Sequence, residues 1–154
     1  MMAKRDEHAI QQEEAARLRK RQMAQQLWRE AVPINNTPAL VYLHKHRQIT
    51  QGLDQLCVKY HPKALDHLHD EQGTFKGNVY RPALLTAVKD KQGTVLSIQR
   101  IYLDPKTANK HSALSVPKRG LGSNPGFAAA VYLGGGQQVI VAEGVETAAS
   151  LVAA

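Results

Sequence analysis

The segment Tyr80-Arg-Pro-Ala-Leu-Leu-Thr-Ala-Val88 is followed by Asp90-Lys-Gln-Gly93 and then by Thr94-Val-Leu-Ser-Ile-Gln-Arg-Ile-Tyr-Leu103. The two outer stretches are apolar and rich in residues that favour strands, and the middle one has the composition of a turn. This order predicts two antiparallel strands joined by a tight turn. The hairpin indicates the fold class, because it is expected to form a small antiparallel sheet.

On the N-terminal side the sequence predicts two helices. Residues 4–31 are rich in Glu, Gln, Lys, Arg and Ala, which favour a long helix that Pro33 ends. Thr37 and Pro38 are typical of a helix start, with the Thr37 side chain as a cap for free amides. We expect this second helix to run to about Arg47.

The remaining segments before and after the hairpin are predicted as strands and loops. Apolar residues alternate with other residues between 52 and 61, as in a half-buried strand. Residues 62–78 are polar and contain Gly and Pro, so they are predicted as a loop. Residues 104–126 are predicted as a long basic loop, and loops of that length are usually either functional or disordered.

The C-terminal part has the pattern of an α/β unit. We expect a short strand over 128–133 and a turn at 134–136. Residues 139–142 form a continuous apolar run, which is typical of a strand buried on both faces of a parallel sheet. Residues 145–154 are predicted as a helix.

The composition is that of a globular chain with an excess of positive charge. Hydrophobic residues make up 43% of the 154 residues, and 20 Lys and Arg against 13 Asp and Glu give a net charge of +7. This excess favours a nucleic-acid partner, although a basic surface without a polyanion has the same composition. No apolar run reaches the length of a membrane span, so we expect a cytoplasmic protein that does not bind a membrane.

The cysteine and histidine content argues against two classes of site. Cys57 is the only cysteine, which excludes an intrachain disulfide and a cysteine-rich zinc module. His61, His67 and His69 follow it, but their spacing fits no established zinc pattern. We therefore expect no zinc.

Glu143 is the candidate catalytic residue. It follows the expected buried strand and precedes Gly144 and a helix, and open α/β sheets place active sites at such strand ends. A carboxylate there can hold a hard cation such as Mg²⁺. The spacing alone leaves open that Glu143 merely ends a strand. Glu146 falls in the first helical turn, where the helix dipole favours a negative side chain.

The segment Val139-Ile-Val-Ala-Glu143-Gly-Val-Glu-Thr-Ala148 resembles the first motif of a Toprim domain, as found in the DNA primases of phages and plasmids. Shorter matches precede it in the same order: Trp28 with Ala31 and Pro33, Thr37-Pro38-Ala39, Tyr42-Leu43, Arg47, Pro82-Ala83-Leu84, Asp90, Gly93 and Arg100-Ile-Tyr-Leu-Asp-Pro105. The resemblance covers roughly residues 25–154.

The resemblance implies a fold of the α+β class in three parts. These parts are a helical extension over 1–33, a primase-like α+β domain over 34–133, and the first strand and helix of a Toprim domain over 134–154. The second Toprim motif, Asp-x-Asp, does not occur in these 154 residues. We therefore expect the Toprim domain to be truncated and the chain alone to be inactive.

The resemblance also implies a function in the replication of a mobile element. The chain would be part of a DNA primase or primase-helicase that makes RNA primers on single-stranded DNA from ribonucleotides, with a helicase as a possible partner. Glu143 would be the catalytic and metal-binding residue, and Mg²⁺ the cofactor. We expect the nucleic-acid phosphates to be bound by basic residues that follow the second strand of the hairpin or lie on it, namely Arg100, Lys106, Lys110, Lys118 and Arg119.

Two other functions remain open from the sequence. The chain could be a non-catalytic nucleic-acid-binding module of a conjugative relaxase or of another mobile-element protein. A different Toprim chemistry, such as that of a nuclease or topoisomerase, ranks last. For Arg100 the sequence leaves open both an ion pair in the core and a contact with a phosphate.

Overall fold

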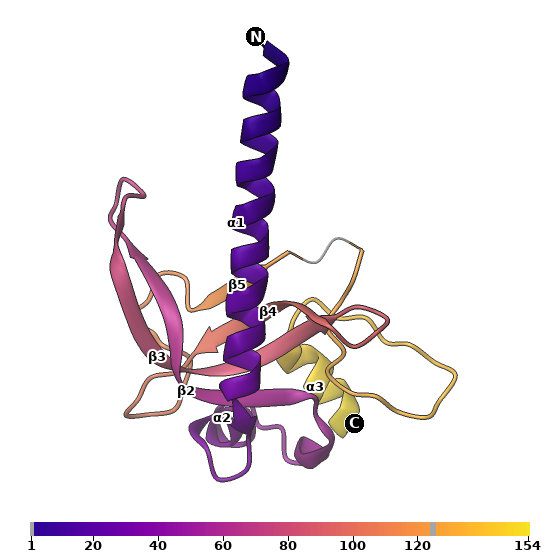
Figure 1. Ribbon diagram of the computed structural model, residues 1–154. Helices are drawn as coiled ribbons and strands as arrows, with labels where there is room; N and C mark the ends of the chain where they lie inside the picture. Colours follow the sequence, from indigo (N-terminus) through magenta and orange to yellow (C-terminus); the bar gives the residue numbers. More distant parts are fainter. Residues whose placement is uncertain (1, 124–125) are drawn as a thin grey trace.

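The computed structural model describes residues 2–123 and 126–154, with side chains from residue 6 onward, and its fold is of the α+β class (Figure 1). A five-stranded antiparallel sheet lies at its centre, in the order β1-β2-β3-β4-β5. The strands are β1 Val32–Pro33, β2 Val58–His69, β3 Phe75–Lys89, β4 Val95–Tyr102 and β5 Lys118–Gly122. The predicted fold class is confirmed.

The first helix, α1, extends over Met2–Glu30, close to the predicted range. Its C-terminal half packs on the sheet through buried residues such as Ala24 and Leu27. Its N-terminal half projects beyond the sheet (Figure 1), and Ile10 there is 55% exposed. The density of charged residues in this half therefore corresponds to a solvated helix.

The second helical region begins as predicted, but its cap differs. Helix α2, Pro38–Val41, continues as a π-helical turn, η1, over Tyr42–His46. The Thr37 hydroxyl donates a hydrogen bond to the carbonyl oxygen of Ile34 at 2.5 Å and makes no side-chain cap. The predicted cap is wrong because the chain already turns between Ile34 and Thr37, which brings that carbonyl within reach of the hydroxyl.

The predicted hairpin is present as β3 and β4. The Asp90 carboxylate accepts hydrogen bonds from the backbone amides of Gln92 and Thr94, both at 2.9 Å. Gly93 has a positive φ of 83°, which favours glycine at that position. The side chain of Asp90 thus closes the turn, as Asp commonly does in such loops.

The prediction of a loop over 62–78 is wrong. Strand β2 continues to His69, and a second turn of the same sequence type, Asp-x-Gln-Gly-Thr, connects it to β3. There the Asp70 carboxylate accepts from the amides of Gln72 and Thr74 at 3.0 and 2.8 Å. Pro62 is accommodated because it lies in a register shift between His61 and Ala64.

The two faces of the sheet carry separate hydrophobic clusters. Helix α1 covers one face and contacts β4, β5 and β2. Helix α3, Val145–Ala153, confirms the helix expected over 145–154 and covers the other face together with α2 and η1. Representative buried residues of the α1 side are Leu27, Leu85, Ile98, Tyr102 and Leu121, and those of the α3 side are Tyr42, Leu84, Ile101, Val145 and Ala149.

The segment before α3 does not contain the predicted strands. Ala129 makes only an isolated bridge with Val88, and Val139, Ile140 and Val141 are 88%, 68% and 87% exposed. In the described part of the chain no parallel strand pairs with this apolar run. A run of this kind becomes a buried strand only where a neighbouring strand satisfies its backbone groups, which its own sequence does not reveal.

The segment predicted as a loop over 104–126 also differs, because it contains strand β5 at the edge of the sheet. The predicted division at residues 33 and 134 stays a prediction, although α1 and α3 both pack against the same sheet. Among the helices of the described residues, none has the length and apolar character needed to cross a membrane.

Candidate nucleic-acid interface

Strand β5 places two of the predicted phosphate-binding residues on opposite faces of the sheet. Lys118 pairs in register with Ile101 of β4, and Arg119 pairs with Arg100. Because side chains alternate along a strand, Lys118 lies on the α3 side and Arg119 on the α1 side. Each of them contacts a buried carboxylate, Glu146 in one case and Asp66 in the other.

On the α3 side the buried carboxylate belongs to Glu146, which is 5% exposed and lies in the first turn of α3. It accepts a hydrogen bond from the Tyr42 hydroxyl at 2.9 Å. The ammonium of Lys110 lies 3.3 Å from one carboxylate oxygen and that of Lys118 lies 3.2 Å from the other. Glu146 therefore ties η1, β5 and the loop after β4 to α3.

The surroundings of Glu146 keep it charged. Burial raises its pKa, but hydrogen bonds from its own backbone amide and from Tyr42, with the charge of Lys118, outweigh burial and lower the pKa to about 2. Burial, together with the charge and hydrogen bond of Glu146, raises the pKa of Tyr42 well above its ordinary value. At neutral pH the pair is therefore a neutral hydroxyl donor and a charged carboxylate acceptor.

The Glu143-Gly144 turn lies beside this cluster. Glu143 itself is exposed, and Gly144 is the N-cap residue of α3. A Cβ atom added to Gly144 would lie 3.2 Å from a carboxylate oxygen of Glu146 and 3.5 Å from the Lys118 ammonium. The residue that follows the candidate catalytic residue thus lies close to Lys118, one of the predicted basic residues, at the positive end of the α3 dipole.

Lys106 is the predicted basic residue that lies most openly on the surface of this region. It is exposed in the turn after Asp104, whose carboxylate accepts a hydrogen bond from the Lys106 backbone amide at 2.8 Å. Its ammonium is available to solvent, whereas those of Lys110 and Lys118 are shared with Glu146.

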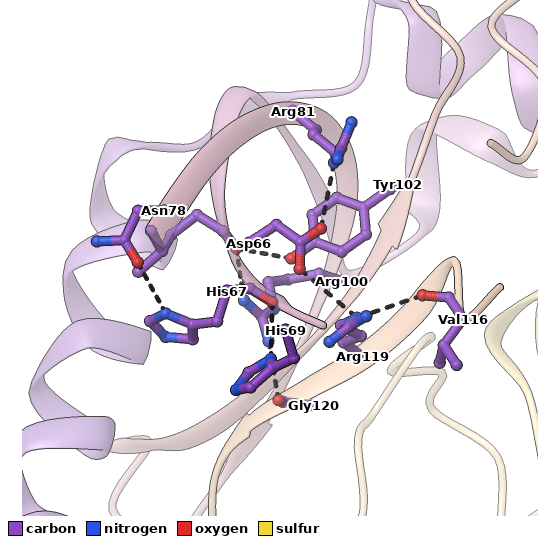
Figure 2. A network of polar contacts seen from close by, with 11 residues as sticks. Asp66, His67, His69, Asn78, Arg81, Arg100, Tyr102, Val116, Arg119 and Gly120 are labelled. Carbon is purple, nitrogen blue, oxygen red and sulfur yellow. Dashed lines mark hydrogen bonds and ion pairs between the residues drawn. The ribbon is translucent and has the colours of Figure 1, made fainter. Parts of the chain in front are cut away.

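On the α1 side the buried carboxylate belongs to Asp66, which is 1% exposed. Figure 2 shows it between Arg81 and Arg119, with Arg100 and Tyr102 beside it. The Nε atom of Arg81 donates to Oδ2 of Asp66 at 3.1 Å, and the Nε atom of Arg119 lies 3.5 Å from Oδ1. Strands β3 and β5 thus bring one arginine each to the carboxylate of Asp66.

Arg100 belongs to the interior of the protein. It is 3% exposed, and its two terminal nitrogens donate to the carbonyl oxygens of Leu65 at 2.5 Å and Gly120 at 2.9 Å. Burial lowers its pKa, and the charge of Asp66 opposes this shift. The structure places Arg100 in the core, where it donates to backbone carbonyls and not to a carboxylate, and at 3% exposure a nucleic-acid phosphate has no access to this side chain.

Sequence reasoning missed most partners of these clusters. Asp66 lay in the segment predicted as a loop, so its contact with Arg81 on the neighbouring strand, where Arg81 pairs in register with Ala64, could not be recognised. Recognising the repeated turn sequence would have extended the hairpin and revealed the pair. For Glu146 the helix dipole was expected, but no local signal points to Tyr42, which is 104 positions away.

The described residues do not form an assembled site for the Mg²⁺ ion expected at Glu143. Within residues 2–123 and 126–154 no group of three His, Cys, Asp or Glu side chains could hold a metal ion. Glu143 is exposed, and the neighbouring Glu146 is engaged by two lysines. These residues by themselves do not fit a Mg²⁺ site, because Mg²⁺ prefers several oxygen ligands in octahedral geometry.

Comparison with known proteins gives a family but no activity. No curated protein and no solved structure matches the chain. Residues 18–131 match the family described as a domain of unknown function, DUF7146. The match includes all residues of the Asp66 cluster, whereas Glu143 and Glu146 follow it. The chain therefore belongs to the DUF7146 family.

Proposed function

We propose that this chain is the nucleic-acid-binding front part of a Toprim-type DNA primase or primase-helicase of a mobile element, with single-stranded DNA as its ligand. The observation that carries the proposal is the position of Lys118 beside the Glu143-Gly144 turn, together with Lys110 on the same Glu146 carboxylate. The lysines come from the basic segment expected to bind phosphates, and Glu143 matches the glutamate of the Toprim motif. The prediction of phosphate-binding lysines and the prediction of a catalytic glutamate therefore concern the same surface.

The charges of this surface support binding of an anion. The Glu146 carboxylate is shared by two lysines, and the second carboxylate of this surface, Glu143, is exposed to solvent. The first amides of α3 add the positive end of its dipole, and Lys106 lies exposed in the preceding loop. Contacts of this kind bind phosphates without reading the base sequence.

Catalysis by the whole enzyme requires more carboxylates than this surface offers. In our proposal Glu143 contributes one ligand to Mg²⁺ only when further carboxylates join it, and ribonucleotides are then the substrates. The 154 residues contain no Asp-x-Asp, and no step through the metal is assigned to this chain.

A second candidate is a non-catalytic nucleic-acid-binding module of a conjugative relaxase or another mobile-element protein. The observation in its favour is the exposure of the apolar run at Val139–Val141, which does not form the expected Toprim strand among the described residues. Primer synthesis by a chain that also carries the Asp-x-Asp motif would decide between the two candidates.

We expect the chain to bind single-stranded DNA weakly and with a strong dependence on salt. Its net charge of +7 and its basic surface bind phosphates by releasing counterions, so affinity falls as salt rises. A labelled oligothymidine titrated at low and moderate salt tests this by fluorescence anisotropy. No binding at low salt would contradict the proposal.

We also expect no primer synthesis by this chain alone. A single exposed glutamate binds Mg²⁺ only loosely, because the ion keeps most of its waters. The chain is incubated with template, labelled ribonucleotides and Mg²⁺, and the products are separated on a gel. Template-dependent RNA would contradict this prediction and show that the chain alone forms a complete catalytic site.

A further inference from the structure

The Asp66 cluster carries more positive charge than its carboxylate neutralises. Asp66 is the carboxylate that contacts Arg81 and Arg119, and Arg100 lies beside them (Figure 2). Burying charged groups costs free energy, and hydrophobic residues of similar size commonly stabilise a fold equally well. The stability of the fold by itself therefore does not require two partly exposed arginines, Arg81 and Arg119, at one aspartate.

The three arginines divide into one structural and two accessible residues. Arg100 is 3% exposed and donates to two backbone carbonyls. The side chains of Arg81 and Arg119 are 20% and 34% exposed. The Nε atom of Arg81 donates to Asp66, whereas that of Arg119 donates to the Val116 carbonyl oxygen at 3.3 Å and forms an ion pair with Asp66 at 3.5 Å. The described residues give the terminal Nη groups of these two arginines no hydrogen-bond partner, so these groups can bind a ligand.

Asp66 holds the two accessible guanidinium groups close together. Arg81 lies 3.1 Å from one oxygen of the carboxylate and Arg119 lies 3.5 Å from the other. The Asp66 side chain is itself 2% exposed, so its position is fixed by the surrounding strands. A pair of guanidinium groups fixed in this way loses little conformational entropy when it binds a phosphate.

We infer that Arg81 and Arg119 form a phosphate-binding pair for single-stranded nucleic acid, oriented by Asp66. The inference rests on the proposed function and adds a second contact, on the sheet face opposite to Lys110 and Lys118. Because Lys118 and Arg119 are consecutive residues of the edge strand β5, a strand of DNA that crosses this edge reaches both faces. Gly120 leaves this edge open, since a Cβ atom there would meet nothing within 4 Å.

The binding test compares two double variants that lose the same charge. Arg81→Gln/Arg119→Gln removes the pair, and Lys45→Gln/Lys91→Gln removes two exposed lysines from other parts of the chain. We expect the arginine variant to bind labelled oligothymidine about tenfold or more weakly than the control variant, because charge-assisted hydrogen bonds are lost. Equal affinities of the two folded variants would overturn the inference.

A measurement on the wild-type chain does not depend on the folding of a variant. The Nε–Hε NMR resonances of Arg81 and Arg119 should shift when oligothymidine is added, and that of Arg100 should stay. Binding by anisotropy without shifts at Arg81 and Arg119 overturns the phosphate pair and leaves the proposed function standing. Absence of any binding to the wild-type chain overturns both.

Discussion

Replacing Asp66 with asparagine should lower the free energy of unfolding by about 3–5 kcal/mol, as removal of one partner from a buried charge cluster commonly does. Asp66 is 1% exposed, and its carboxylate faces the guanidinium groups of Arg81 and Arg119. Without its charge, Arg100 remains buried at 3% exposure among like charges. Urea unfolding at neutral pH, followed by circular dichroism, measures the loss.

Two control variants separate the buried charge from a general effect of mutation. Arg119→Gln removes a partly exposed partner of Asp66 and should cost no more than about 1 kcal/mol. The double variant Asp66→Asn/Arg100→Met also removes the buried cation. Its loss in the free energy of unfolding should therefore be smaller than the sum of the losses of Asp66→Asn and Arg100→Met. A loss below about 1 kcal/mol for Asp66→Asn would show that the cluster is not coupled as described.

Replacing Glu146 with glutamine should cost on the order of 3 kcal/mol at pH 7. The folded protein lowers the pKa of this carboxyl from 4.5 to about 2, and each unit of pKa corresponds to about 1.4 kcal/mol. Because the pKa is lowered on folding, the stabilisation is fully present above pH 4.5 and is lost as the pH falls towards 2. The difference in the free energy of unfolding between wild type and Glu146→Gln should therefore become smaller below pH 4.5.

The matched control is the other glutamate of the motif. Glu143 is exposed, so Glu143→Gln should change stability by no more than about 0.5 kcal/mol at any pH. Urea unfolding of the three proteins between pH 7 and pH 3 gives the comparison. A difference between wild type and Glu146→Gln that stays constant with pH would contradict the lowered pKa. If Glu143→Gln and Glu146→Gln lowered the free energy of unfolding equally, the stabilising role assigned to the buried Glu146 would be contradicted.

The central hairpin could be predicted because its signals are local. The apolar strands β3 and β4 flank a turn that contains Asp90 and Gly93, whose side-chain and backbone requirements are specific to a turn. The β2–β3 connection carries the same Asp-x-Gln-Gly-Thr signal at Asp70–Thr74, and comparing the two would have extended both strands. Pro62 and the polar residues around it concealed this extension.

The C-terminal strand and the charged clusters could not be predicted in the same way. The run Val139–Val141 has the composition of a buried strand, but burial depends on a neighbour that its own sequence does not specify. The partners of Glu146 come from η1, β5 and the loop after β4, which are brought together only by the folded sheet. The positive charge of Lys110 and Lys118 is evident from the sequence, but the Glu146 carboxylate that they share is not.

The most direct test of the account is the salt dependence of single-stranded DNA binding by the wild type and by Lys110→Gln/Lys118→Gln. Each phosphate contact on a single strand contributes about 0.7 to the slope of log K against log salt. We predict a steep negative slope for the wild type and a slope flatter by about 0.7–1.4 for the variant, while Lys45→Gln/Lys91→Gln stays closer to the wild type. Equal slopes for the wild type and for Lys110→Gln/Lys118→Gln would contradict the claim that this surface binds the phosphates.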